Sequence, residues 1–226
     1  MSSPSARRLH TIAGAIVLAA FVVEHVATNA SVLWGADAYD RVVGSIQRWK
    51  LLALFEVVFI LLPLAYHAIY GLRLLARPSA DAEVERFGDR RLWVLQRVSA
   101  TVVFLFVAVH LWELRVQRLF FGLDPAALHT VLTAHLSWTY AGVPWLALFY
   151  LLGVAATSFH LANGLFAASA LKGWATRRMR VLTSIVGGAV FVAGALTVLG
   201  FATGTQFSSD PSGANAPPCG SVVAPK

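Results

Sequence analysis

Apolar residues run through this chain in five long stretches separated by short polar segments. The stretches cover approximately residues 10–34, 49–76, 92–119, 142–171 and 180–203. About 20 consecutive apolar residues are enough for a helix to cross the ~30 Å hydrocarbon core of a bilayer. A spanning helix satisfies its own backbone, and the alternating pattern of a membrane β-barrel is absent from the sequence. The pattern therefore predicts an all-α integral membrane protein with five transmembrane helices.

Composition supports one membrane domain with little soluble structure. Of the 226 residues, 58% are hydrophobic and 13% are charged, which is too apolar for a soluble domain of this length. The first stretch carries Glu24 and His25 and lacks a small-residue cleavage site, so it does not resemble a signal peptide. From Gly204 onward the chain is rich in Ser, Gly, Pro and Ala. We therefore expect a five-helix domain over 1–203 and a disordered outer tail over 204–226.

Basic residues are distributed unevenly between the polar segments. The net charge of +7 could suit nucleic-acid binding, but Lys and Arg gather near the N-terminus and in segments 77–91 and 172–180. A five-helix chain places these regions on one side. With that side in the cytoplasm, twelve of the 18 basic residues are inside, as the positive-inside rule requires. The charge thus predicts an inner N-terminus, an outer C-terminus, membrane lipid as surroundings and no nucleic-acid partner.

Four histidines are the candidate functional residues. Ionisable side chains within a membrane are energetically costly and therefore usually functional. His25, His67, His110 and His160 occupy the first four stretches, one in each. At 1.5 Å rise per residue, the two outward-running helices place His25 and His110 in the outer half of the membrane. The two inward-running helices place His67 and His160 in the inner half. Depth therefore predicts an outer pair and an inner pair, and paired imidazoles on facing helices suit low-spin haem iron.

Neighbouring residues support the inner pair more than the outer one. Gly71 and Gly164 each follow an inner histidine by four residues, so they leave room on the ligand's face for a porphyrin plane. The outer histidines have no such glycines. His10, Arg97 and Asn163 lie toward the inner side, where they could contact haem propionates or a partner. A single bare metal site is the poorer alternative, because it would need all four histidines at one depth.

Longer motifs carry a resemblance to a known family. They are RRLHTIAG at 7–14, EHVATN at 24–29, EVVFILLPLAYHAIYG at 56–71, LQRVSATVVFLFVAVHLWELR at 95–115 and GVAATSFHLANGL at 153–165. Together they touch four helices. The chain resembles the five-helix, dihaem cytochrome b membrane anchor of succinate:quinone oxidoreductases and fumarate reductases. Four of the five helices are then expected to form a haem-binding bundle.

The resemblance implies a position in an electron-transfer complex. Such an anchor binds two b haems and docks a flavoprotein subunit and an iron–sulfur subunit on the cytoplasmic face of the bacterial inner membrane. Electrons from succinate pass to a quinone, chiefly menaquinone in the five-helix type, or in reverse for fumarate reduction. The family's ligands fall on His25 and His110 for the distal haem and on His67 and His160 for the proximal haem.

Quinone reduction takes up two protons, so its site needs a group that exchanges protons with water. Glu56 precedes His67 by eleven residues, about three helical turns, so it shares its face and lies nearer the outer surface. We interpret Glu56 as the first candidate for quinone or proton transfer. Glu113, three residues after His110, is the second.

Other interpretations of the membrane carboxylates stay open. Glu113 could instead form an ion pair with Arg115 or Arg118 at the interface. Glu24 adjoins His25, so it projects about 100° away from the ligand's face and could hydrogen-bond a neighbouring helix.

The outer segment 120–141 is expected to carry no site. Turn signals at Asp124 and Pro125 precede a short stretch that suits an interfacial helix. It contains His129 and His135, which we interpret as solvated residues.

Two other functions share some of these features. Other respiratory dihaem anchors, such as those of nitrate reductases or hydrogenases, commonly distribute their ligand histidines differently among the helices. A haem-free, proton-coupled transporter could use the buried histidines and glutamates as a relay. Haem content separates this transporter from the cytochromes.

Overall fold

The structure, a computed structural model, describes residues 4–76, 81–204 and 207. Within these residues the chain is helical, and the only extended pairing is an isolated bridge between Tyr140 and Val143. The predicted tail lies outside the described residues apart from Gly204 and Phe207.

Five helices in the described part of the chain are long and apolar enough to cross a membrane. They are Ser5–Trp34, Leu52–Leu75, Arg90–Phe120, Trp145–Ala170 and Arg177–Thr203. Their bounds differ from those predicted by at most five residues, and the ends at Trp34 and Thr203 coincide with the prediction. The all-α fold and the five transmembrane helices are therefore confirmed.

The first three of these helices are each built from several segments in continuous succession. The first comprises α1 (Pro4–Ile12), η1 (Ala13–Leu18), α2 (Ala19–Asn29) and η2 (Ala30–Trp34). The second comprises α4 (Leu52–Phe55), η3 (Glu56–Leu61) and α5 (Leu62–Leu75), and the third α7 (Arg90–His110), η4 (Leu111–Val116) and α8 (Gln117–Phe120). The fourth and fifth are single α-helices, α10 (Trp145–Ala170) and α11 (Arg177–Thr203).

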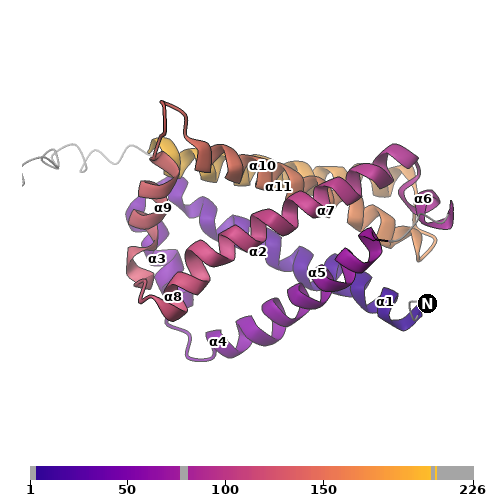
Figure 1. The fold of residues 1–226 in the computed structure, drawn as a ribbon, viewed down its shortest axis with the longest axis horizontal. Helices are drawn as coiled ribbons and strands as arrows, with labels where there is room; N and C mark the ends of the chain where they lie inside the picture. The colour runs from indigo at the N-terminus through magenta and orange to yellow at the C-terminus, as the bar shows by residue number, and fades with distance from the viewer. Residues whose placement is uncertain (1–3, 77–80, 205–206, 208–226) are drawn as a thin grey trace, which may run out of the picture.

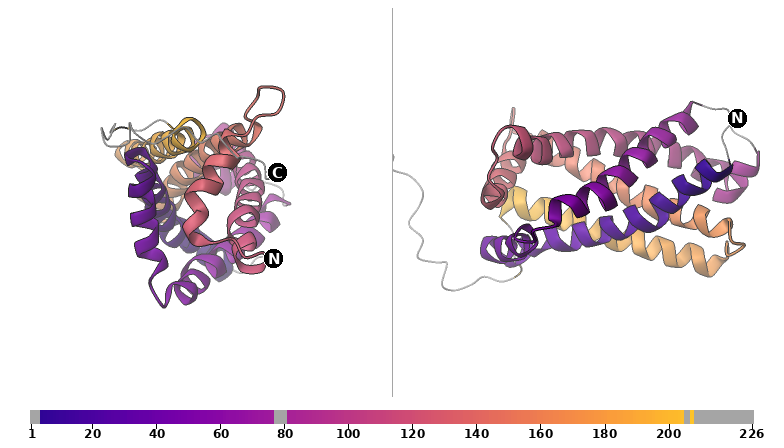
Figure 2. Two further views of the ribbon diagram at one scale, coloured as in Figure 1. Left: turned by 90° about the vertical axis from the view of Figure 1, so that its left-hand side faces the viewer. Right: turned by 90° about the horizontal axis from the view of Figure 1, so that it is seen from below.

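Short helices close both ends of the bundle. At one end, α3 (Ala36–Gln47) and α9 (Leu128–Ser137) lie across the ends of the long helices, with the turn η5 (Pro125–Ala127) before α9 (Figures 1 and 2). At the other end, α6 (Asp81–Phe87) lies near the N-terminus and the turn between α10 and α11 (Figure 1). Asp89 begins α7, because its carboxylate accepts a hydrogen bond from the Arg91 backbone amide at 2.9 Å.

Segments η1, η3 and η4 are π-helical, a form that is rare and frequent at functional sites. In the second helix the cause is local. Pro63 lacks a backbone N–H and cannot continue the regular bonding pattern, so the turns before it widen into η3.

Helices α10 and α11 pack closely because small residues face each other between them. A Cβ atom at Gly187 would lie 2.6 Å from the Cβ atom of Ala162 and 2.9 Å from the Ser158 carbonyl oxygen. One at Gly194 would lie 2.8 Å from a methyl group of Val154. Small residues at such positions let transmembrane helices approach closely.

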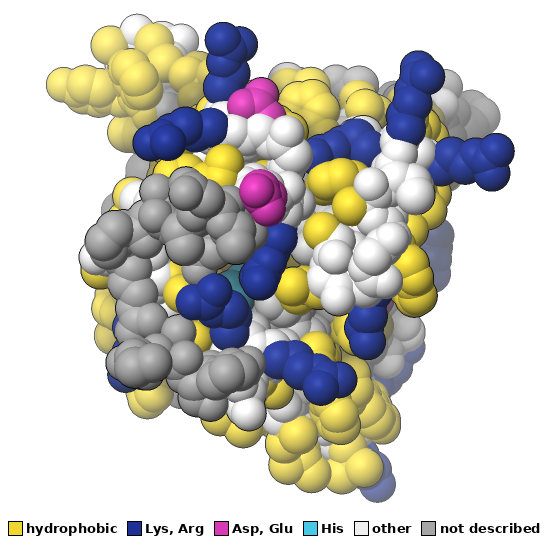
Figure 3. Space-filling view, turned by 90° about the vertical axis from the view of Figure 1, so that its right-hand side faces the viewer, with side chains coloured by type: hydrophobic (Ala, Val, Ile, Leu, Met, Phe, Trp, Pro, Cys, Tyr) yellow, Lys and Arg dark blue, Asp and Glu magenta, His cyan; other side chains and the backbone are white. Residues whose placement is uncertain are grey.

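The sides and ends of the bundle differ in polarity. Large apolar side chains, including Phe59, Leu62 and Ile185, are more than half exposed on the sides, as lipid contact requires. Lys and Arg side chains ring the end that bears α6 (Figure 3). The described basic residues toward this end are Arg7, Arg8, Arg73, Arg86, Arg90, Arg91, Arg97, Lys172, Arg177, Arg178 and Arg180. Arg77 lies outside the described residues.

Candidate functional site

The structure brings the four membrane histidines together in two separate pairs. His25 of α2 and His110 of α7 have ring centroids 5.7 Å apart, with ring planes at 86°. His67 of α5 and His160 of α10 have ring centroids 6.3 Å apart, with ring planes at 88°. These are the two pairs that depth along the helices predicts. That they bind haem iron stays a prediction. We keep the names outer pair for His25 and His110 and inner pair for His67 and His160, and we call the end of the bundle that bears α6 the inner end and the opposite end the outer end. These names follow the predicted orientation.

Both separations fit two imidazoles on one metal ion. With metal–nitrogen bonds of about 2 Å, imidazoles that bind from opposite sides have ring centres about 6 Å apart. Among the described residues, no group of three His, Cys, Asp or Glu side chains could hold a metal ion. The arrangement is thus two two-imidazole sites, the ligand set of a bis-histidine haem.

The hydrogen bond of His67 favours metal binding. Its Nδ1 atom lies 3.1 Å from the backbone carbonyl oxygen of His10, which can only accept. The proton is therefore on Nδ1, and the lone pair of Nε2 is free for a ligand. The His10 ring stacks on His67 at 4.1 Å with 6° between the planes, and Gly14 lies so close that a Cβ atom there would collide with the His67 ring. His10 is therefore beside the inner pair, where its sequence position suggested.

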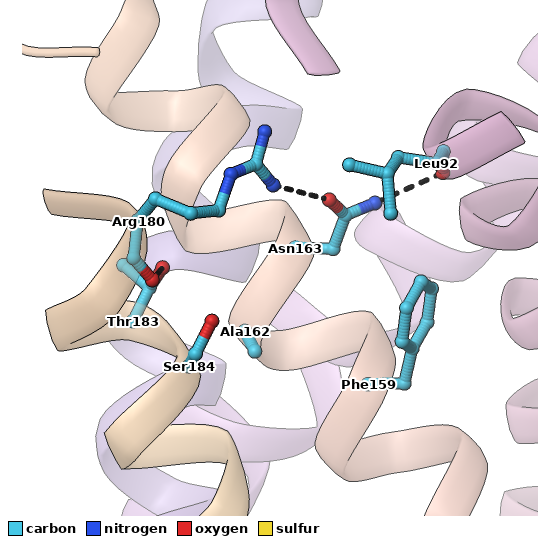
Figure 4. Close-up of a pocket in the computed structure, with 7 residues that line it drawn as sticks. All are labelled: Leu92, Phe159, Ala162, Asn163, Arg180, Thr183 and Ser184. Carbon is cyan, nitrogen blue, oxygen red and sulfur yellow. Dashed lines mark hydrogen bonds between the residues drawn. The ribbon is translucent and has the colours of Figure 1, made fainter. Parts of the chain in front are cut away.

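His160 is held by a polar chain that extends to the inner end of the bundle. Gln96 Nε2 lies 3.0 Å from His160 Nδ1, and Gln96 Oε1 accepts a hydrogen bond from Asn163 at 3.0 Å. Asn163 is 4% exposed, and its own oxygen accepts from Arg180 at 3.1 Å (Figure 4). Arg180 also donates to the Phe87 carbonyl oxygen at the end of α6. Asn163 and Arg180 therefore fasten α6 to the helix that carries His160.

The Ser99 hydroxyl is a second polar group within reach of His160 Nδ1. Ser99 Oγ lies 3.4 Å from His160 Nδ1 and donates its own proton to the Gln96 carbonyl oxygen at 3.0 Å. Its lone pair accepts an Nδ1 proton only when the Gln96 side-chain nitrogen, which can only donate, turns away from Nδ1. Gln96 Nε2 then keeps its bond to the His160 carbonyl oxygen, at 3.1 Å.

Of the remaining inner candidates, the two glycines lie beside groups that contact this pair, whereas Arg97 contacts the end of the second transmembrane helix. A Cβ atom at Gly71 would be 3.6 Å from His10 Nε2, and one at Gly164 would be 3.2 Å from Gln96 Nε2. Arg97 donates to the Leu75 carbonyl oxygen. It therefore joins the third helix to the end of the second.

A tyrosine connects the outer histidine pair to a carboxylate. The Tyr150 hydroxyl, on α10, donates to Glu113 Oε2 at 2.7 Å and lies 3.4 Å from His110 Nδ1. The second oxygen of Glu113 is 3.9 Å from His135 Nδ1 on α9. Because His135 is 48% exposed on its side chain, this row of groups leads from the outer pair to the surface.

The structure also pairs the other membrane carboxylates. Glu56 forms an ion pair with Arg115 at 2.5 Å, which joins η3 to η4. Arg115 is therefore the partner of Glu56 and not of Glu113. Arg118 donates to Gln47 at 2.5 Å.

Glu24 accepts a hydrogen bond from Thr28 at 2.6 Å and is exposed on the side of its helix. Its partner is thus on its own helix, not on a neighbouring one.

The interpretation of His129 and His135 as solvated residues was wrong in part. Both lie on α9, the short helix expected in this segment. His129 is partly buried, and its ring packs 5.7 Å from Tyr39 and 5.8 Å from Phe201. Burial, followed by the charge of Asp40, raises the pKa of Tyr39 to about 12. His135 is exposed but faces Glu113.

Reasoning from sequence missed Tyr150, Gln96, Ser99 and Gly14. Gln96 had a usable signal, because it precedes His110 by fourteen residues, which puts it nearly on the same helix face but at the inner depth. Gly14 and Tyr150 had none, since their contacts depend on how the helices are rotated against each other.

Comparison with known proteins agrees with the resemblance carried by the motifs. No family model matches the chain. The succinate dehydrogenase cytochrome b558 subunit of Bacillus subtilis (strain 168) is 29% identical over 188 residues, which is 83% of this chain and 89% of that protein. The five long apolar helices fit a membrane anchor. The resemblance to a cytochrome b membrane subunit of succinate dehydrogenase is therefore confirmed, because the similarity covers most of the length of both proteins.

Proposed function

We propose that this chain anchors a succinate dehydrogenase or fumarate reductase complex in the membrane and transfers electrons between its partner subunits and quinone through two b haems. The observation that carries this proposal is the pair of two-imidazole sites, one in each half of the bundle. The related protein is named as a cytochrome subunit of succinate dehydrogenase, which supports the haem and the complex.

His67 and His160 would hold the inner haem, and His25 and His110 the outer one. A bound haem supplies a one-electron carrier whose potential the protein tunes through its ligands and their hydrogen bonds. This chain provides an Nε2 lone pair at His67, because the Nδ1 proton is held by the His10 carbonyl oxygen. Gly71 and Gly164 keep side chains away from the inner site. Arg97 and His10 would contact propionates at the inner end.

The two ends of the bundle would have different functions, partner docking at one end and quinone binding at the other. The basic inner end, with α6, would face the cytoplasm of a bacterial cell and dock an iron–sulfur subunit and a flavoprotein subunit. The outer end would bind quinone, menaquinone in the five-helix type, near Glu56 and Glu113. Both carboxylates are partly buried and paired with groups at the outer end, Arg115 for Glu56 and His135 for Glu113. Such a position suits proton exchange with the outer side.

Haem quantitation on histidine variants tests the proposal. The wild-type chain is expected to contain two low-spin b haems with distinct potentials. His25→Ala should lose one of them and His67→Ala the other. His129→Ala is the matched control, because it removes a partly buried histidine of the outer end and should retain both.

Three results would contradict the proposal. They are a wild-type protein without haem, loss of the same spectral component in both variants, or equal loss in the control. Co-purification of a subunit with covalent flavin and an iron–sulfur subunit would distinguish a succinate dehydrogenase from other dihaem anchors.

A further inference from the structure

Tyr150 is enclosed at the outer histidine pair by aromatic rings. It is 6% exposed, and its ring centroid lies 5.2 Å from that of Phe106 and 5.8 Å from that of His110. Its hydroxyl therefore has little access to water and must satisfy its hydrogen bonds within the protein. Two partners are in reach, Glu113 Oε2 at 2.7 Å and His110 Nδ1 at 3.4 Å.

The chemistry of the three groups sets the direction of both hydrogen bonds. An ionised carboxylate has no proton to give, so the single proton of the Tyr150 hydroxyl goes to Glu113. The hydroxyl oxygen can then only accept from His110. His110 must therefore carry its proton on Nδ1, which leaves the lone pair of Nε2 for a ligand.

We propose that Tyr150, with Glu113 behind it, is a positioning residue that fixes the tautomer of His110 and lowers the midpoint potential of the outer haem. This inference rests on the proposed function. A hydrogen bond from a ligating imidazole toward a carboxylate makes the imidazole more basic. A more basic ligand stabilises the oxidised iron, so reduction becomes less favourable.

The inner pair lacks this particular arrangement at His67. The Nδ1 proton of His67 goes to a backbone carbonyl oxygen, that of His10, and a neutral carbonyl polarises an imidazole less than a tyrosine backed by a carboxylate. Substitutions at Tyr150 should therefore shift the midpoint potential of the outer haem and not that of the inner haem. That selectivity distinguishes tuning of a ligand from general loosening of the bundle.

The test is a redox titration with electron paramagnetic resonance of the haem-loaded protein. Tyr150→Phe removes the hydroxyl but keeps the ring, and Glu113→Gln keeps the hydrogen bond but removes the charge. Both should raise the midpoint potential of the outer haem and shift its low-spin signal, with the larger change in Tyr150→Phe. The inner haem should keep its potential in both variants.

Tyr39→Phe is the matched control. Tyr39 is a buried tyrosine of the same end, 2% exposed, whose hydroxyl lies 3.5 Å from Asn29 and does not contact His110. An unchanged outer haem in both test variants, or an equal shift in Tyr39→Phe, would overturn the proposal. If Tyr150→Phe fails to retain the outer haem, the potential in Glu113→Gln decides alone. A wild-type protein without haem would instead refute the proposed function.

Discussion

At the scale of single residues, the ion pair with Arg115 defines what a substitution at Glu56 tests. Glu56→Gln keeps the size of the side chain and an oxygen acceptor for Arg115, but it cannot take up a proton. If Glu56 transfers protons to or from quinone, turnover should fall by about 10²-fold, the low end of the range for general acid–base catalysis. Both haem spectra should stay unchanged. Quinone-linked turnover in membranes, compared with Asp37→Asn at an exposed carboxylate of α3, measures the effect.

Turnover equal to wild type in Glu56→Gln would remove Glu56 from the mechanism. A loss of haem in the same variant would instead show that the ion pair is structural.

Gly14 limits the space beside the inner pair in a way that one methyl group can test. A Cβ atom at Gly14 would lie 2.8 Å from His67 Nδ1, closer than non-bonded atoms approach. Gly14→Ala should therefore push the His67 ring away from the His10 carbonyl oxygen. The expected result is loss or a marked spectral shift of the inner haem, with the outer haem intact.

Gly188→Ala is the control for Gly14→Ala, because a Cβ atom at Gly188 meets nothing within 4 Å. Two unaltered haems in Gly14→Ala, measured by reduced-minus-oxidised difference spectra, would contradict the close contact.

Depth and rotation explain which contacts of these residues could be predicted from sequence. The positions of His25 and His110 along their helices follow from residue number and helix direction alone, so the pairing of these two histidines could be predicted from the sequence. The contact between Tyr150 and Glu113 also needs the rotation of α10 against the third helix. That rotation is set by the packing of side chains such as Phe106. The periodicity of apolar residues in the sequence does not predict such packing.

At the scale of elements, the α10–α11 interface depends on small residues at fixed positions. Gly187→Val would place a branched side chain against Ala162 and the Ser158 carbonyl oxygen, and a backbone atom cannot move aside cheaply. We expect the helices to separate and the protein to lose about 1–3 kcal/mol of stability, the usual cost of overpacking. Thermal unfolding in detergent, followed by haem release, measures this loss.

The adjacent position supplies the control for that interface. Gly188→Val adds the same side chain one residue along the same helix, where the space is open. Similar melting temperatures for the two variants would show that α10 and α11 do not pack through Gly187.

The π-helical segments show where element-level prediction from sequence stops. The sequence is apolar throughout η1, η3 and η4, so its hydropathy predicts uninterrupted α-helices. Only η3 has a visible cause, because Pro63 follows it. Segments η3 and η4 carry Glu56 and Arg115, which form an ion pair, so two of these irregular segments meet at one contact.

At the scale of the whole molecule, the five spans were predictable because membrane thickness fixes helix length and hydropathy is a local property. The packing of α3 across the outer end was not, since α3 is not apolar enough to stand out, whereas α9 matches the short interfacial helix expected in 120–141. Tyr39 of α3 packs against Phe201 of α11 with ring centroids 5.2 Å apart, a contact between residues far apart in sequence. The outer end is thereby closed by interfacial helices, whereas the inner end presents mainly charge.

The charge at the inner end leads to a prediction about partner docking. Arg90 and Arg91 are exposed at the start of α7, next to α6. Surface charges steer association and suppress wrong partners, so reversing them weakens docking of a complementary surface. Arg90→Glu with Arg91→Glu should therefore lower the amount of iron–sulfur and flavoprotein subunits that co-purify with the chain. Retention of both haems would show that the bundle still assembles.

A matched reversal at the opposite end separates docking from a general charge effect. Arg48→Glu with Lys50→Glu changes two exposed basic residues just before the second transmembrane helix, at the outer end. This variant should co-purify with its partners as the wild type does, because the partners would meet only the inner end. Because salt screens exposed charges, raising the ionic strength should release partners from the wild type and from the outer variant alike. Equal losses in the two double variants would place the docking surface elsewhere than at α6 and the start of α7.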